Sequence, residues 1–160
     1  MSATSESNTS VQSSRPGTID MKLEVVAIPV ADVDRAKAFY ANLGWRLDAD
    51  LRFGEVRVVQ FTPTHSECSV AFGSGLIKAE PGTAERLEIV VSDLEAARAD
   101  LLARGVEVSD FFHRGEAGFE AGLDPQRTSY ASYATFDDPD GNSWLLQEVT
   151  DRLPGRTWED

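Results

Sequence analysis

Two segments of this chain share one residue pattern, and this internal repeat constrains the fold more than any other feature. Val30–Ala38 reads VADVDRAKA, and Val91–Ala99 reads VSDLEAARA 61 positions later. At the same offset Gly44 corresponds to Gly105. Self-similarity at a fixed offset indicates duplicated structural units. We therefore expect two copies of one supersecondary unit.

Each copy carries the start and stop signals of a helix. Asp32 and Asp93 follow apolar stretches, where a carboxylate can accept hydrogen bonds from the free amides of a first helical turn. Gly44 and Gly105 follow the last helical residues, where a left-handed conformation suits glycine. Between these signals, apolar residues recur at helical spacing and predict one buried stripe per helix. They are Val33, Ala36, Phe39, Tyr40 and Leu43 in the first copy and Leu94, Ala97 and Leu101 in the second.

Short apolar stretches around the helices predict strands, so each unit is expected to be βαβββ. In the first copy the stretches are Leu23–Val30, Trp45–Leu51, Val56–Phe61 and Cys68–Phe72, and in the second Leu87–Val91, Val106–Phe112, Tyr130–Phe136 and Ser143–Val149. The fold class is therefore α+β, with a single domain over about residues 21–150. Its modules cover about 22–75 and 86–150, a Ser/Thr-rich tail covers 1–20, and a C-terminal tail covers 151–160.

The amino-acid composition argues against several classes of binding partner. The 160 residues carry a formal net charge of -12, and 41% are hydrophobic. Nucleic acid and anionic lipid bind clustered Lys and Arg, so this charge argues against both. Cys68 is the only cysteine, which excludes an internal disulfide and favours a reducing cytoplasm. The absence of a long apolar run predicts no membrane-spanning helix.

With these features in order, the chain resembles the vicinal oxygen chelate superfamily, which includes glyoxalase I, bleomycin-resistance proteins and extradiol dioxygenases. The resemblance is carried by Ile28–Ala36, by Phe39–Tyr40 with Leu43–Trp45, by the echo Val90–Ala97, and by Phe136–Asn142, which reads FDDPDGN. It covers nearly all of residues 23–149. It implies that two βαβββ modules form a curved mixed sheet whose concave face holds a small molecule.

The resemblance also implies four positions for ligands of a divalent metal, and this chain departs from the pattern there. The positions are Val25, Val70, Arg86 and Leu145, none of which suits a metal. If the register were shifted, nearby glutamates would restore donors, but strand alternation argues against Glu24 and Glu148 and leaves only Glu88, which has the parity of Arg86. We therefore predict no metal site and no cofactor, with a divalent metal at a shifted register as the alternative.

Three residues are candidates for catalysis without a metal. His113 is either a general acid or base, or an exposed loop histidine. Arg86 is either a cation at the metal position that binds a carboxylate or a polarised oxygen, or a linker arginine. Glu88 is either a general base or the salt partner of Arg86.

Five further residues are candidates for ligand contact. The connection from His113 to Ser129, which contains Arg127, is long enough to form the rim of a pocket. Alternate residues of a strand point to one face, so Tyr130 and Tyr133 are expected on opposite faces. The candidate contacts are Arg57, Arg127, Tyr130, Phe72 and Trp144, with core packing as the alternative for the aromatic pair.

The leading hypothesis is a bleomycin-resistance-like protein that sequesters a small molecule between modules or across a homodimer. The second is a metal-independent lyase, isomerase or cyclase that uses Arg86, Glu88 and His113. The third is a metal-dependent glyoxalase or dioxygenase with relocated ligands. Fold alone does not decide among these chemistries.

Overall fold

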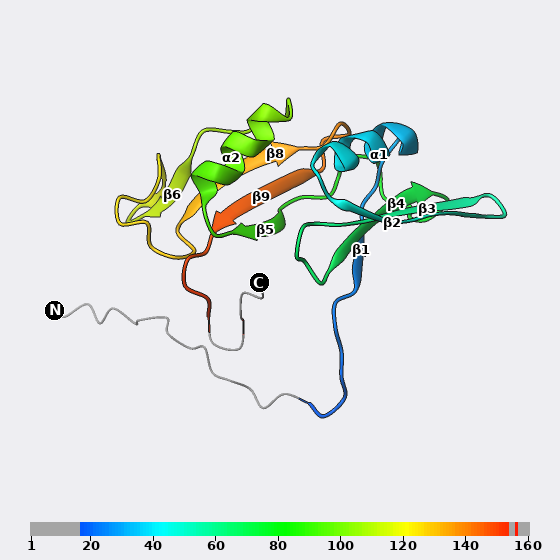
Figure 1. The fold of residues 1–160 in the computed structure, drawn as a ribbon, viewed down its shortest axis with the longest axis horizontal. Helices are drawn as coiled ribbons and strands as arrows, with labels where there is room; N and C mark the ends of the chain where they lie inside the picture. Colours follow the sequence, from blue (N-terminus) through cyan, green and yellow to red (C-terminus); the bar gives the residue numbers. More distant parts are fainter. Residues whose placement is uncertain (1–16, 154–155, 157–160) are drawn as a thin grey trace.

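Two sheets, each covered by one helix, build the protein in the computed structural model, which describes residues 17–153 and 156 (Figure 1). The first module contains β1 (Val25–Ala27), α1 (Val33–Asn42), β2 (Arg46–Phe53), β3 (Val56–Thr62) and β4 (Ser69–Ser74). The second contains β5 (Leu87–Val91), α2 (Leu94–Ala103), β6 (Phe112–Gly115), β7 (Gly118–Ala121), β8 (Ser132–Asp137) and β9 (Ser143–Glu148). The predicted tail at residues 1–20 lies mostly outside the described residues.

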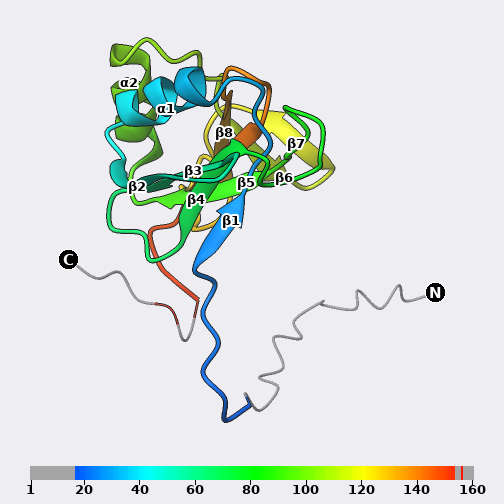
Figure 2. The ribbon, with the colours of Figure 1, turned by 90° about the vertical axis from the view of Figure 1, so that its right-hand side faces the viewer.

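The strand orders are β1-β4-β3-β2 in the first sheet and β5-β9-β8-β6-β7 in the second. Each module begins with a parallel pair, β1 with β4 and β5 with β9, while the other neighbours are antiparallel. Both helices lie on the same side of the two sheets, and the described terminal segments leave on the other side (Figures 1 and 2). The predicted α+β class is confirmed. None of the helices in the described part of the chain is long and apolar enough to cross a membrane.

The predicted helix signals are confirmed in both modules. Asp32 accepts a hydrogen bond from the amide of Arg35 at 3.0 Å, and Asp93 accepts one from Ala96 at 3.1 Å. Gly44 and Gly105 have φ values of 82° and 80° after the last turns. A side chain in this left-handed conformation is strained, so glycine ends both helices at low cost.

The second module differs from its prediction between the helix and β8. Instead of a strand over Val106–Phe112, regular pairing begins only at Phe112. Before it, Ser109 makes a separate contact with β8: its amide donates to the Thr135 carbonyl at 2.9 Å, and its hydroxyl accepts from the Thr135 amide at 2.8 Å. The expected long loop from His113 to Ser129 contains the β6–β7 hairpin, whose turn is closed by Gly115 and Gly118. The second module therefore carries one hairpin more than the βαβββ pattern.

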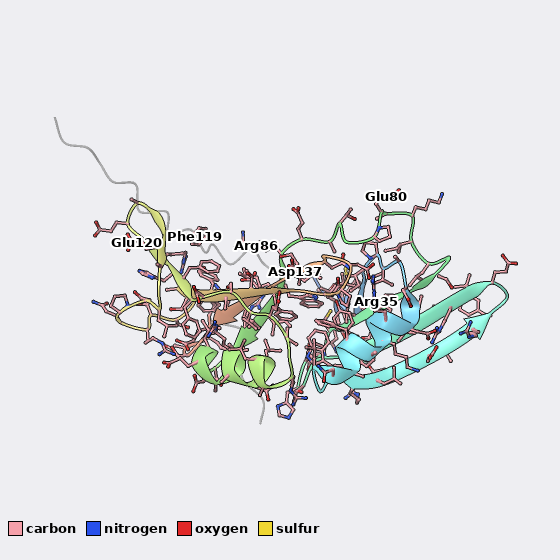
Figure 3. All side chains as sticks on the ribbon, turned by 90° about the horizontal axis from the view of Figure 1, so that it is seen from above. Arg35, Glu80, Arg86, Phe119, Glu120 and Asp137 are labelled. Atoms are coloured by element: carbon pink, nitrogen blue, oxygen red, sulfur yellow. The ribbon has the colours of Figure 1, made fainter. Side chains whose placement is uncertain are left out.

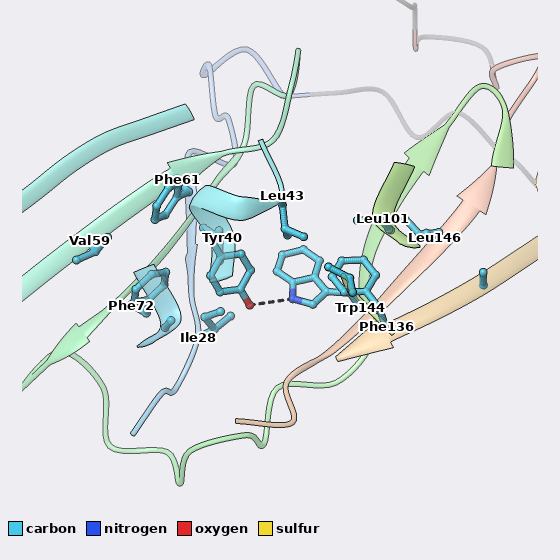
Figure 4. Packing of buried hydrophobic residues seen from close by; sticks show 14 of the residues in the cluster. Ile28, Tyr40, Leu43, Val59, Phe61, Phe72, Leu101, Phe136, Trp144 and Leu146 are labelled. Carbon is cyan, nitrogen blue, oxygen red and sulfur yellow. Dashed lines mark hydrogen bonds between the residues drawn. The ribbon is translucent and has the colours of Figure 1, made fainter. Parts of the chain in front are cut away.

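The hydrophobic core is shared by both modules. The buried residues of α1 pack against those of β3, β4, β8 and β9, and Tyr40 and Trp144 meet at the boundary with ring centroids 6.0 Å apart (Figure 4). Most of the predicted stripes belongs to this core, and Ala36, Tyr40 and Leu94 are each 0% exposed. Ala97 is the exception, since it is only half-buried and lies outside the core cluster. Burial of this apolar surface holds the modules together.

A buried polar contact lies at the centre of this boundary. The Tyr40 hydroxyl donates to Asp138 Oδ2 at 2.8 Å and accepts from Trp144 Nε1 at 3.0 Å. Burial, with the Asp138 carboxylate, raises the pKa of Tyr40 above its ordinary value, so the hydroxyl keeps its proton and remains a donor. From the same turn, Asn142 Nδ2 donates to the Pro29 carbonyl of the first module at 2.8 Å.

We expect Tyr40→Phe to lower the free energy of unfolding by about 1–3 kcal/mol, because it leaves the buried indole N–H of Trp144 without its acceptor and Asp138 without one donor. Urea unfolding measures the loss. Trp144→Phe and the double variant complete a cycle, in which the double variant should lose less than the sum of the single ones. Full additivity would contradict a direct contact between the modules through this hydroxyl.

Candidate functional site

The face of the second sheet that points away from α2, called here the helix-distal face, carries a row of directly paired residues. Phe112 pairs with Tyr133, Tyr133 with Gln147, and Gln147 with Val90. Residues paired directly across strands point to the same face. Their strand neighbours on the opposite face, such as Ile89 and Leu146, belong to the core beside α2. The row therefore spans four strands on the side without a helix.

A pocket of about 340 Å³ lies against this face. Its lining combines strand residues with residues that follow β9, namely Glu88, Val90, Tyr130, Gln147, Leu153 and Arg156. The volume is within the range of about 300–1,000 Å³ that is usual for small-molecule sites. The lining is more polar than that of a typical site, because Glu88, Gln147 and Arg156 are charged or amide side chains.

Tyr130 enters the pocket from a constrained backbone. Its φ of 69° is left-handed, and its amide donates to the Glu148 carbonyl at 2.8 Å. Its own carbonyl accepts from the Tyr133 hydroxyl at 2.9 Å and from Gln147 Nε2 at 2.9 Å. The predicted strand over Tyr130–Phe136 is corrected, because β8 begins at Ser132 and regular alternation does not extend back to Tyr130.

An aromatic cluster continues the helix-distal face beyond the pocket. Phe112 stacks on Tyr133 with ring centroids 5.4 Å apart, and Phe119 meets both rings edge-on at 5.6 and 5.8 Å. Phe119 is 67% exposed. It lies with Glu120 on the hairpin at one end of the molecule, whereas Arg86 lies nearer the middle (Figure 3).

The three candidate catalytic residues are not assembled into one site. Glu88 lines the pocket, and Arg86 is an exposed residue with a φ of 53° immediately before β5. His113 pairs with Ser132 and so points to the face opposite Phe112 and the pocket. There its Nδ1 lies 2.7 Å from the Gly122 carbonyl oxygen, and its Nε2 lies 3.3 Å from Glu120 Oε2.

Three of the candidate ligand contacts lie on the helix side of the sheets. Phe72 is 0% exposed and Trp144 is 5% exposed, both within the core. Arg57 is held by two carboxylates, with Nη1 2.8 Å from Asp34 Oδ1 and Nε 3.0 Å from Asp50 Oδ1. All three side chains therefore have structural contacts within the protein, and none of them lines the pocket.

Arg127 does not line the pocket, and it forms ion pairs with two carboxylates. Its Nη2 lies 2.5 Å and its Nε 2.8 Å from the Glu148 carboxylate, and its Nη1 lies 2.6 Å from Glu95. Glu148 also accepts from the Leu94 amide at the start of α2 at 2.8 Å. This network anchors the segment that carries Tyr130 into the pocket.

The positions that the resemblance assigns to metal ligands lie on both faces of the sheets. Val25 and Leu145 point to the helix-distal faces, since their neighbours Val26 and Leu146 face the helices. Val70 is corrected, because it is 3% exposed and lies in the core beside α1. Within residues 17–153 and 156, the structure contains no group of three or more His, Cys, Asp or Glu side chains that could hold a metal ion.

Sequence reasoning missed four lining residues. Val90 and Gln147 follow from strand alternation, because each lies two positions beyond an inward-facing residue, Glu88 or Leu145. Leu153 and Arg156 have no comparable signal, since they come from a segment without a strand or helix pattern.

The comparisons with known proteins are consistent with this architecture. A family model described as bleomycin resistance protein-like N-terminal matches residues 25–61. The structure of TnmS3, an antibiotic binding protein from Streptomyces sp. CB03234, is 27% identical and has a TM-score of 0.65, covering 83% of this chain and 99% of that one. A comparison with curated proteins found no match.

Two further solved structures are similar over most of their length. A glyoxalase/bleomycin resistance protein from the same Streptomyces strain is 28% identical, with a TM-score of 0.61 and coverage of 79% of this chain and 100% of that one. A member of the glyoxalase/bleomycin resistance protein/dioxygenase superfamily from Sphaerobacter thermophilus DSM 20745 is 25% identical, with a TM-score of 0.63 and coverage of 81% and 98%.

Glu148 makes the support of the pocket sensitive to acid. Its hydrogen bonds with Arg127 lower the pKa of the carboxyl below its ordinary value of 4.5, against the opposing effect of burial. A depressed pKa in the folded state contributes stability above the unfolded value, and this contribution is lost as pH falls through the folded value.

We expect Glu148→Gln to cost roughly 2 kcal/mol of unfolding free energy at neutral pH, because it breaks a charge-assisted pair on a buried group. The difference from the unchanged protein should shrink as pH falls below about 4.5, where the wild-type carboxyl loses its advantage. Urea unfolding at several pH values measures this. A difference that stays constant into the acid range would contradict the assigned role of the ion pair.

Proposed function

Because this chain belongs to the vicinal oxygen chelate superfamily, the superfamily of glyoxalases, bleomycin-resistance proteins and dioxygenases, we propose that it binds and sequesters a small organic molecule. The binding site in this proposal is the pocket on the helix-distal face of the second sheet. The observation that carries it is the convergence of Glu88, Gln147 and Tyr130 with the apolar side chains of Val90 and Leu153 around one pocket.

Two features of the molecule support binding without turnover. The potential acid–base pair is separated by the sheet, since Glu88 lies on the helix-distal face and His113 on the opposite face. A general acid and base must both reach the reacting molecule, so this separation weighs against the proposed metal-independent enzyme. The apolar side chains at Val25 and Leu145 weigh in the same way against a metal-dependent one.

The solved structure of an antibiotic binding protein provides independent support for the ligand class. That protein is 27% identical to this chain over 83% of its length. The aromatic cluster of Phe112, Phe119 and Tyr133 beside the pocket offers ring faces and edges on which a planar group of such a compound can pack. We therefore propose antibiotic-like organic molecules as the ligands.

A homodimer is part of the proposal, because the first sheet leaves apolar residues without cover. Leu51 and Phe53 pair with Val58 and Val56 on the face away from α1, and they are 57% and 61% exposed. Apolar residues that gather on one exposed face indicate an interaction surface. We assign this surface to a second copy. Cys68 is a free thiol, which fits the cytoplasmic location that we also propose.

We expect Leu51→Asp with Phe53→Asp to shift the protein from dimer to monomer, because the charges would be desolvated at the interface. Sedimentation equilibrium measures the assembly. Leu102→Asp, an equal change at a 44% exposed position on α2, is the control and should leave it unchanged. A wild-type protein that stays monomeric at all concentrations would rule out this part of the proposal.

We expect Val90→Trp to weaken ligand binding by at least about tenfold, because the indole fills the pocket. A panel of aromatic antibiotics, bleomycin included, is first screened by thermal shift, and hits are titrated calorimetrically. Leu102→Trp adds the same bulk on the outer surface of α2 and should leave affinity unchanged. Failure of the whole panel to bind the wild-type protein, or equal affinity of the Val90→Trp variant, would refute the proposed site.

A further inference from the structure

The segment that follows β9 is fastened to the second module by hydrogen bonds from one serine and one tyrosine. Ser129 Oγ accepts from the amides of Thr150 and Asp151 at 3.1 and 3.0 Å and donates to the Asp151 carbonyl at 2.8 Å. Tyr130 Oη accepts from the Leu153 amide at 3.1 Å. The segment leaves β9 on the side of the sheet away from α2 (Figures 1 and 2).

This attachment brings two side chains of the segment onto the pocket. Leu153 and Arg156 are both lining residues, and the Arg156 amide donates to the Leu153 carbonyl at 3.1 Å. The pocket is therefore bounded partly by strands β5 and β9 and partly by the C-terminal segment.

The charges on the two sides of the pocket are opposite. Glu88 is the charged residue contributed by the sheet, Arg156 is the one contributed by the segment, and the remaining lining residues are uncharged. Within the described part of the chain neither side chain forms an ion pair, whereas Arg57 and Arg127 are each held by two carboxylates. A guanidinium without a protein partner is suited to bind a carboxylate, sulfonate or phosphate.

We propose that the described residues of the C-terminal segment, 150–153 and 156, form a wall of the ligand pocket and set its charge preference, with Arg156 binding an anionic group of the ligand. Ser129 and Tyr130 are positioning residues that hold this wall in place. The inference deepens the proposed function and rests on it. In this inference the ligand carries an acidic group that binds Arg156. Without the segment, Glu88 on the sheet would favour a cationic ligand.

Two fluorescent dyes of opposite charge test the charge preference. The anion is anilinonaphthalene sulfonate, and the cation is thioflavin T. Arg156→Gln should weaken binding of the anion by about tenfold, the effect of losing one charge-assisted hydrogen bond, and leave binding of the cation equal or tighter. Glu88→Gln should do the reverse. Arg46→Gln removes the same charge from an exposed site on the first sheet and should change neither affinity.

A thiol in the pocket tests the wall without any ligand. Val90→Cys in a Cys68→Ser background provides one reactive thiol beneath the segment. Ending the chain after Thr150 should raise its rate of maleimide modification several-fold, and Ser129→Ala, which removes the three hydrogen bonds of that hydroxyl, should raise it by less. The rate at a second thiol, Leu102→Cys on α2, should not change.

The outcomes separate this inference from the proposed function. If the wild-type protein binds neither dye while truncation exposes the thiol, the proposed ligand binding at this pocket is overturned, and the C-terminal segment remains a wall. Dye binding that Arg156→Gln leaves unchanged, or a thiol rate unaffected by truncation, would overturn the inference and leave the proposed function standing.

Discussion

The hydroxyl of Tyr40 connects the two modules, and the arrangement of the rest depends on it. It comes from α1, while both of its partners, Asp138 and Trp144, come from the second module. An unsatisfied polar group in this core would cost more than the bond itself contributes, so the contact fixes one relative position of the modules. Both helices then lie on one side of the molecule and both helix-distal faces on the other (Figure 1).

The duplicated helices show how one sequence pattern is used for two purposes. In each copy, an acidic residue in the first helical turn forms an ion pair with an arginine. Asp34 pairs with Arg57, and Glu95 pairs with Arg127. In the first module the arginine lies on a central strand, whereas in the second it lies on the connection before β8. The second arginine also binds Glu148, and this extra link brings the connection that carries Tyr130 against the sheet.

Sequence patterns predicted the parts of the fold that depend on local backbone chemistry. Asp32 and Asp93 as caps and Gly44 and Gly105 as left-handed ends were readable because each of these positions suits few residue types. The β6–β7 hairpin was not readable, since its strands are short and its glycines look the same in an open loop. The expected strand at Val106–Phe112 is absent before Phe112, where Ser109 bonds to Thr135 partly through its hydroxyl, a contact that the apolar pattern does not reveal.

The candidate site was harder to predict for a physical reason. The sequence does not distinguish an aromatic residue in a core, such as Trp144, from one that lines a pocket. It also does not show whether the partner of an arginine such as Arg57 is a ligand or an aspartate. Only the strand parity of Glu88 and Leu145 carried spatial information, and it pointed to the face against which the pocket lies.

Arg57 and Arg127 are held by carboxylates of the same chain, and Arg86 does not line the pocket. Among the described residues, the cation that lines the pocket is therefore Arg156, from the segment after the last strand. The side chains on the inward positions of a sheet pack against their neighbours, so these positions tolerate few changes. A short segment held by hydrogen bonds from Ser129 and Tyr130 can change its side chains at little cost to the stability of the fold. Placing the charge on the segment therefore separates the choice of ligand from the stability of the sheet. In a fold that serves many chemistries, this is a direct route to a new specificity.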